Sequence, residues 1–268
     1  MGWPVSHSRS PLIHKHWIAE HGLRGDYVLL PVEPSGLQAA VRALPALGFA
    51  GCNLTIPHKV EAMQWLDMVE PSARRIGAVN TIVVQEDGGL LGRNTDAFGF
   101  IESLRQEHPN WHSERHPACV VGAGGAARAV LCALLDSGVP EIRLCNRSSV
   151  KALDLAQEFG PTVQSVPWES RHEALRDVGL LVNTTNQGML GQDPLDLQLD
   201  ALPLTAVVSD IIYVPLQTPL LVQAKARGNP TSHGLGMLLH QARPAFEAWF
   251  GVRPEVTPEL WQKALASL

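Results

Sequence analysis

The sequence predicts an α/β protein with two domains, and three observations lead to this fold class. Apolar runs of strand length alternate along the chain with runs of good helix formers. A glycine-rich turn joins one of these strands to the helix that follows it near the middle of the chain. A polar stretch over residues 108–117 separates the two halves and has the composition of a domain linker.

The central part of the chain predicts a doubly wound, Rossmann-like domain. Strands alternate here with helices, which argues for a parallel sheet covered by helices on both faces. The expected strands are residues 118–121, 141–145, 180–183 and 206–212, and the expected helices are residues 126–135 and 151–159. Ser137-Gly138 and Gly160-Pro161 end the two helices.

The first hundred residues also alternate and predict a second α/β domain. The expected strands are residues 29–32, 50–54 and 81–84, and the expected helices are residues 37–47, 59–66 and 97–105. Two more helices are expected near the end of the chain, at residues 235–250 and 258–266. The loop at residues 2–11 lacks the strand that should precede it, since only Met1 does so. Two explanations stay open: a start codon placed late, or a sheet that lacks one strand.

The composition predicts a globular protein without a nucleic-acid or membrane partner. Hydrophobic residues make up 45% and charged residues 18% of the 268 positions, and the net charge is −5. A negative net charge gives no indication of a phosphate-backbone partner, although a small anionic ligand stays possible because local patches need not follow the net charge. No long uncharged apolar run is present, so we expect no signal peptide or membrane span and a cytoplasmic location. The four cysteines lie far apart and are expected to be small buried hydrophobic side chains.

The glycine-rich turn, Gly122-x-Gly124-x-x-Ala127, predicts a dinucleotide site because it lies between a strand and a helix. The first glycine permits the tight turn and the second lets a pyrophosphate approach the backbone. The small third residue allows close packing, and the helix N-terminus holds the anion. The alternative is a glycine-rich turn without a ligand.

The end of the next strand favours NADP over NAD. An NAD site places an acidic residue there to bind the ribose hydroxyls, whereas this chain has Asn146-Arg147-Ser148. A guanidinium forms a bidentate pair with a 2′-phosphate, and hydroxyls add donors. The alternative is that Arg147 is a solvated turn residue.

Several polar residues at loop ends predict a second site, for a ligand rich in hydroxyls. Lys59 lies in the first turn of an expected helix that begins at Pro57, where the positive end of the helix dipole disfavours a cation. Asp96 and Asn80 lie at other loop ends. A solvated Lys59 and an Asp96 that only caps its helix are the alternatives. His112, His116 and Cys119 have a metal-like spacing but lack a fourth ligand, so no metal is expected.

Taken together, nine stretches of the chain resemble the shikimate dehydrogenase family in the family's own order. These are GWPVSHSRSPLIH, NLTIPHK, GAVNT, NTDAFGF, GAGGAARAV, NRS, NTTNQGM, DIIYVPLQTPLL and HGLGMLLHQA. The resemblance implies NADPH-dependent reduction of 3-dehydroshikimate to shikimate in aromatic amino-acid biosynthesis. It also implies a substrate domain over residues 1–97 plus 232–268 and an NADP domain over residues 98–231.

The resemblance implies roles for individual residues. Ser8 and Ser10 match the residues that hold the substrate carboxylate, and Lys59 matches the acid–base lysine, with Asp96 as its partner. The further substrate positions that it implies are Thr55, Asn80, Asp96, Tyr213 and Gln241. The cofactor positions that it implies are Gly122, Ala123, Gly124, Gly125, Ala126, Asn146, Arg147, Ser148, Lys151, Ile211, Gly234 and Met237.

The sequence departs from the family pattern at a few positions and leaves two other functions to be weighed. His233 stands where an acidic or amide residue is common, and Lys151 stands where an arginine often completes the phosphate clamp. One alternative is an NAD-dependent quinate or shikimate dehydrogenase. The other is a non-catalytic NADP-binding relative with a decayed substrate cleft. For the enzyme we expect only small-molecule partners and a monomer or homodimer.

Overall fold

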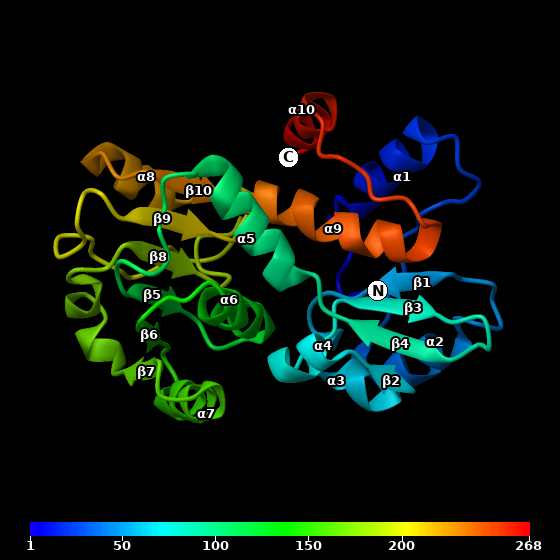
Figure 1. The fold of residues 1–268 in the computed structure, drawn as a ribbon, viewed down its shortest axis with the longest axis horizontal. Coiled ribbons are helices and arrows are strands. Elements are labelled where there is room, and N and C mark those ends of the chain that lie inside the picture. Colours follow the sequence, from blue (N-terminus) through cyan, green and yellow to red (C-terminus); the bar gives the residue numbers. More distant parts are fainter. The chain divides into compact units, whose positions relative to one another are not determined.

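The computed structural model describes residues 1–268 and consists of two compact units (Figure 1). Unit 1 comprises Met1–Gly99 and Leu239–Ser267, and unit 2 comprises Phe100–Leu238 with Leu268. The two boundaries lie within helices α5 (Asp96–Glu107) and α9 (Gly234–Phe250). Each unit contains its own sheet, so the expected α/β fold with two domains is confirmed.

Unit 1 is built on a mixed four-stranded sheet with the order β1-β3-β4-β2. β3 pairs antiparallel with both β1 and β4, and β2 pairs parallel with β4. The strands are β1 (Gly51–Asn53), β2 (Met68–Val69), β3 (Thr81–Val84) and β4 (Leu90–Arg93). The helices are α1 (Ser10–Glu20), α2 (Leu37–Ala43), α3 (His58–Glu61), α4 (Pro71–Ile76) and α10 (Pro258–Ala266), with one part each of α5 and α9.

Met1 and Gly2 form a short extended segment. It lies between the segment that contains Asn53 and Thr55 and the segment that contains Pro31. The Met1 ammonium group donates to Asn53 O at 2.6 Å, and Thr55 N donates to Met1 O at 3.0 Å. On the other side Gly2 forms a parallel bridge with Pro31. The strand expected at residues 29–32 is therefore wrong in extent, because only this bridge forms. The loop at residues 2–11, which carries Ser8 and Ser10 and is called the serine loop below, therefore starts from a hydrogen-bonded segment.

An aromatic core joins the two ends of the chain within unit 1. Trp17 of α1 and Phe246 of α9 are fully buried and in edge contact, with ring centroids 5.5 Å apart. The Trp17 indole also donates to Glu255 O at 2.9 Å. These contacts hold α1, which carries Ser10 as its first residue, against the C-terminal segment.

Unit 2 is built on a six-stranded parallel sheet with the order β10-β9-β8-β5-β6-β7. The strands are β5 (Ala118–Val121), β6 (Ile142–Cys145), β7 (Val163–Val166), β8 (Leu180–Asn183), β9 (Val207–Asp210) and β10 (Thr231–His233). Helices α6 (Gly125–Asp136), α7 (Ser149–Phe159) and α8 (Pro219–Arg227) connect them. Strand order reverses between β5 and β8, and a ligand crevice lies at such a switch point in open parallel sheets.

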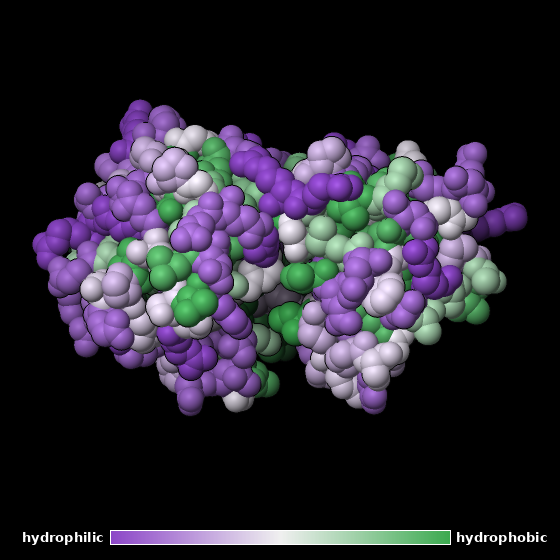
Figure 2. Space-filling model, turned by 90° about the horizontal axis from the view of Figure 1, so that it is seen from below, coloured by the Kyte–Doolittle hydropathy of each residue, from purple (hydrophilic) through white to green (hydrophobic).

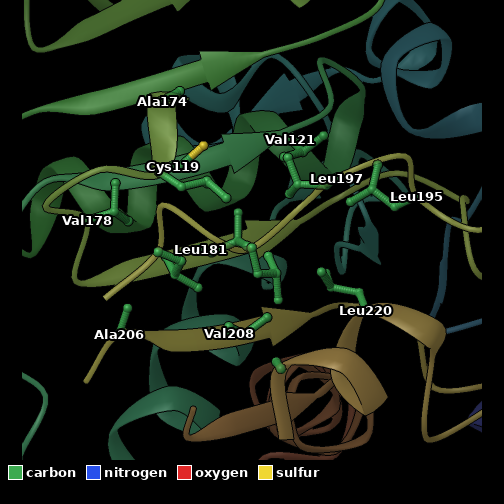
Figure 3. Close-up of a cluster of buried hydrophobic side chains, with 14 of the residues drawn as sticks. Cys119, Val121, Ala174, Val178, Leu181, Leu195, Leu197, Ala206, Val208 and Leu220 are labelled. Carbon is green, nitrogen blue, oxygen red and sulfur yellow. The ribbon is translucent and has the colours of Figure 1, made fainter. Parts of the chain in front are cut away.

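The core of unit 2 explains why its strands read as continuous apolar runs. All residues of β5, β8 and β9 are buried. Figure 3 shows Cys119, Leu181 and Val208 from these strands packed with Leu197 and Leu220. A sheet buried on both faces needs apolar side chains at every position. All four cysteines of the chain are free and buried, as expected.

Several expected elements have other bounds in the structure, and several elements of the structure were not expected. The helices expected at 37–47 and 59–66 end at Ala43 and Glu61, and Pro57 precedes α3 instead of starting it. A 3₁₀ helix, Ala62–Trp65, continues α3, and the strand expected at 206–212 ends at Asp210. The missed elements are α1, β2, α4, β4, β7, α8 and β10. Most of these are short or have polar residues at positions that interrupt the apolar period.

On the face shown in Figure 2, hydrophilic residues predominate and hydrophobic residues form small groups. No helix combines the length and the apolar composition that a membrane crossing demands.

Candidate active site

The centre of the candidate site in unit 1 is an ion pair between Lys59 and Asp96. Lys59 Nζ lies 2.5 Å from Asp96 Oδ2, and the two side chains are 20% and 6% exposed. Lys59 is the second residue of α3, and Asp96 is the first residue of α5. The alternatives left open by the sequence, a solvated lysine and a carboxylate that only caps a helix, do not describe this geometry.

Asn80 links the ion pair to other polar side chains at the same place. Its amide nitrogen donates to Asp96 Oδ1 at 2.8 Å, to Thr95 Oγ1 at 2.9 Å and to Gln241 Oε1 at 3.3 Å. Asn80, Thr95 and Gln241 are buried, and Gln241 comes from α9. Four of the residues expected at the substrate site, Lys59, Asn80, Asp96 and Gln241, therefore lie together.

The serine loop presents two hydroxyls close to each other. Ser8 Oγ donates to Ser10 Oγ at 3.3 Å, and Ser10 N donates to Ser8 Oγ at 3.3 Å. Both hydroxyls remain able to donate to an anion, since a serine hydroxyl rotates. Thr55 lies between β1 and α3, and its carbonyl oxygen accepts from His58 N at 2.9 Å. These three residues form the remaining part of the substrate set in unit 1.

The glycine turn in unit 2 has the geometry of a dinucleotide site. Gly122 has φ +116°, and a Cβ there would overlap the Thr184 hydroxyl. Gly124 and Gly125, by contrast, face open space, so a pyrophosphate can approach the start of α6. Helix α6 has 12 residues, and its first N–H groups have no partners within the helix. Ala123 and Ala126 complete this turn, which follows β5 at the switch point of the sheet.

The segment after β6 carries the residues expected to hold the 2′-phosphate. Asn146 Nδ2 donates to Ser148 O at 2.9 Å, and Ser148 is the N-cap of α7, its side chain accepting from Lys151 N at 3.5 Å. Arg147 and Lys151 are exposed and form no ion pair. Two free cations next to a hydrogen-bonded turn fit the 2′-phosphate of NADP.

The ends of β8, β9 and β10 carry the last expected residues. Asp210 Oδ2 accepts from Asn183 Nδ2 at 3.1 Å and from Thr218 Oγ1 at 2.8 Å, which joins the loops after β8 and β9. Burial raises the pKa of Asp210 to about 6. Sequence reasoning gave Asp210 no role, although an acidic residue that ends an apolar strand was a signal.

The loop after β9 lies next to the start of α9. Gly234 N donates to Ile212 O at 3.0 Å, and a Cβ on Gly234 would collide with the Ile211 carbonyl. Ile211 and Gly234 are therefore brought together as expected. Tyr213 lies on the same loop and Met237 one turn into α9, both partly buried and both in unit 2.

The parallel sheet, its switch point and the glycine turn define the class: an α/β protein with a dinucleotide-binding fold, whose second domain carries the Lys59–Asp96 ion pair. Comparison with known proteins narrows this class. The model of the shikimate dehydrogenase substrate binding domain matches residues 1–82, and that of shikimate / quinate 5-dehydrogenase matches residues 103–190. The model of the shikimate 5'-dehydrogenase C-terminal domain matches residues 234–258.

Individual relatives agree with these matches over the whole chain. The shikimate dehydrogenase (NADP(+)) of Paramagnetospirillum magneticum is 59% identical over 97% of this chain and 94% of its own. The shikimate 5-dehydrogenase of Thermus thermophilus, solved in complex with NADP(H) and shikimate, has a TM-score of 0.88 at 39% identity and covers 100% of this chain and 97% of its own. The NAD complex of quinate dehydrogenase from Corynebacterium glutamicum has a TM-score of 0.91 at 29% identity, with coverage of 100% and 97%. The chain belongs to the shikimate dehydrogenase family.

Proposed function

We infer that this chain is an enzyme that reversibly reduces 3-dehydroshikimate to shikimate with NADPH, in the pathway to the aromatic amino acids. Family membership at up to 59% identity supports the reaction. The observation in this chain that carries the inference is the Lys59–Asp96 pair at 2.5 Å, because carbonyl reduction needs a proton donor. A relative with a decayed substrate cleft would have no reason to retain it.

We propose that residues 1–97 plus 232–268 bind the substrate and that residues 98–231 bind NADP. The Ser8 and Ser10 hydroxyls hold the substrate carboxylate, and rigid presentation by the preceding segment lowers the ordering cost. Thr55, Asn80, Asp96, Tyr213 and Gln241 bind or orient the ring hydroxyls. Since a site built to bind a hydroxyl rejects analogues without it by about 10⁴–10⁵, these contacts set specificity.

In the reaction, Lys59 delivers a proton to the oxygen that becomes the new hydroxyl group. NADPH, when bound, supplies the hydride. Asp96 holds the Lys59 ammonium group and accepts a hydrogen bond from the adjacent substrate hydroxyl. In the reverse direction Lys59 takes the proton from the shikimate hydroxyl, as microscopic reversibility requires.

Gly122–Ala126 and the start of α6 hold the pyrophosphate of NADP, while Asn146, Arg147, Ser148 and Lys151 hold the 2′-phosphate. Ile211, Gly234 and Met237 line the nicotinamide position. The open space at Gly124 and Gly125 and the free cations after β6 support this assignment. We further propose that the enzyme acts in the cytoplasm, where it meets the NADP(H) pool, as a monomer or homodimer.

One set of assays tests the proposed function against its two alternatives. Shikimate and quinate are each offered with NADP and with NAD, and reduction of the cofactor is followed by absorbance. We expect turnover of shikimate with NADP to dominate. Preferred turnover of quinate with NAD would reassign the enzyme, and calorimetric binding of NADP without binding of shikimate would identify a non-catalytic protein.

A further inference from the structure

A chain of hydrogen bonds runs through unit 1 from Tyr27 to Asp96. The Tyr27 hydroxyl donates to Asn53 Oδ1 at 2.7 Å, and Asn53 Nδ2 donates to Thr81 Oγ1 at 3.0 Å. The Thr81 hydroxyl donates to Asn80 Oδ1 at 2.9 Å, and Asn80 Nδ2 donates to Asp96 Oδ1 at 2.8 Å. The other carboxylate oxygen of Asp96 binds Lys59, so the chain ends at the acid–base pair.

The direction of each bond is fixed by backbone groups on either side. Asn53 Nδ2 also donates to the carbonyl oxygen of Asn80 at 3.2 Å, so a flipped Asn53 amide would set two acceptors against each other. Thr95 N donates to Asn80 Oδ1 at 2.9 Å and fixes the second amide in the same way. The Thr81 hydroxyl lies between a donor and an acceptor, and its proton therefore points to Asn80. Every donor in the chain points toward Asp96.

The inner part of the chain, from Thr81 to Asp96, is shielded from solvent, whereas Tyr27 and Asn53 are partly buried. Thr81, Asn80 and Asp96 are 0%, 2% and 4% exposed, and hydrogen bonds in such a low-dielectric interior polarise and strengthen one another. At the other end the Tyr27 ring stacks on the imidazole of His14, with centroids 4.3 Å apart and planes at 5°. His14 is fully buried without hydrogen bonds to its ring nitrogens, and burial lowers its pKa to about 3. His14 is therefore neutral, and the face of its ring holds the Tyr27 ring in place by stacking.

We propose that Tyr27, Asn53 and Thr81 are positioning residues for the Lys59–Asp96 pair. None of them need touch substrate. They hold the Asn80 amide in the one orientation that engages Asp96 Oδ1 and leaves Oδ2 for the lysine. The chain begins beside the serine loop, because the Ser10 side chain lies close to the Tyr27 hydroxyl. The inference deepens the proposed function and rests on it, because it assigns a purpose to the Lys59–Asp96 pair only if that pair is catalytic. A misplaced acid–base pair slows a reaction far more than it weakens binding.

Substitutions at Thr81 test the centre of the chain. Thr81→Val removes the hydroxyl at nearly constant volume, and we expect kcat for shikimate oxidation to fall about tenfold, the cost of one buried hydrogen bond. The KM for NADP stays unchanged, and Thr81→Ser restores most of kcat. The matched control is Ile82→Val, a fully buried neighbour in β3 whose side chain points to the opposite face. Its expected effect is a small loss of stability with kcat retained.

A second readout needs no turnover. Proton exchange of the Lys59 ammonium group, measured by NMR on ¹⁵N-labelled lysine, reports directly on its contact with Asp96. We expect several-fold faster exchange in Thr81→Val and in Tyr27→Phe than in the wild type and in Ile82→Val. Unchanged exchange in both variants, or a Thr81→Ser enzyme as slow as Thr81→Val, would overturn the proposal. A wild-type chain without shikimate turnover but with the expected exchange pattern would instead count against the proposed function alone.

Discussion

Replacing Lys59 by alanine tests its proposed role as the proton donor, because the substitution removes the ammonium group and leaves the rest of both units in place. Lys59 Nζ is 2.5 Å from Asp96 Oδ2, so the substitution takes away the cation that pairs with this carboxylate. General acid–base catalysis contributes about 10²–10⁴-fold, which corresponds to roughly 3–5 kcal/mol of activation free energy. We expect Lys59→Ala to lose about this factor in kcat, with NADP binding unchanged because the cofactor residues lie in unit 2.

The same substitution has a modest cost in stability. Removing one partner of a fully buried ion pair costs about 3–5 kcal/mol. Here the Lys59 side chain is 20% exposed, and Asp96 keeps its hydrogen bond from Asn80 and its place in the first turn of α5. We therefore expect a loss of about 2 kcal/mol in the free energy of unfolding.

The measurement combines initial rates of NADP reduction by shikimate, fluorescence titration with NADP and urea unfolding. Lys263→Ala is the matched control, because Lys263 is an exposed lysine of unit 1 paired with Glu259. The control should keep its kcat and its stability within error. A Lys59→Ala enzyme with kcat within about threefold of the wild type would refute the role of Lys59, since even the weakest general acids contribute more.

Three further predictions concern unit 2. The pKa of Asp210 is raised from its usual value near 3.8 to about 6, so the native state binds the proton more tightly than the unfolded state does. The stability that this proton contributes is therefore fully present below about pH 4 and is lost as the pH rises through 6. This contribution to the free energy of unfolding is at most about 3 kcal/mol. In urea unfolding between pH 4.5 and 7, the stability of Asp210→Asn should depend less on pH than that of the wild type. Identical slopes for the two proteins would contradict a raised pKa of Asp210. Arg147→Ala should raise the KM for NADP about 10- to 100-fold and leave that for NAD unchanged, and equal losses for both cofactors would contradict a 2′-phosphate contact. Gly122→Ala should abolish NADP binding in calorimetry and lower the melting temperature, because φ is +116° and the methyl group would overlap Thr184; a variant that binds normally would disprove this.

Much of the candidate site was predictable from the sequence because its signals are local. The glycine turn needs small residues at a fixed spacing between a strand and a helix, and Arg147 follows the next strand at a position set by the fold. Lys59, Asn80 and Asp96 stand at loop ends next to strands and helices that propensity predicts. The residue types and their places at loop ends were therefore predictable from the sequence, whereas the distances between them were not.

Short elements were decided by long-range contacts. β2 has two residues and pairs only with β4, so it is too short to show the alternation of apolar and polar residues that predicts a strand. Helix α1 contains four ionisable residues, His14, Lys15, His16 and Glu20. Its stability comes from Trp17 packing against Phe246 near the other end of the chain. Propensity describes what a segment prefers alone, and tertiary contacts override it in elements this short.

The sequence by itself determined the two-domain α/β fold, the glycine turn between a strand and a helix and the preference for NADP, and it singled out Lys59 and Asp96 as candidate acid–base residues. Only the tertiary structure decided that Tyr27, Asn53 and Thr81 form one hydrogen-bonded chain to Asp96, and that Asp210 ties two loops together. The physical reason is that apolar periodicity and turn chemistry act between near neighbours. The partner of a buried polar group is instead whichever group the folded chain brings within about 3 Å of it.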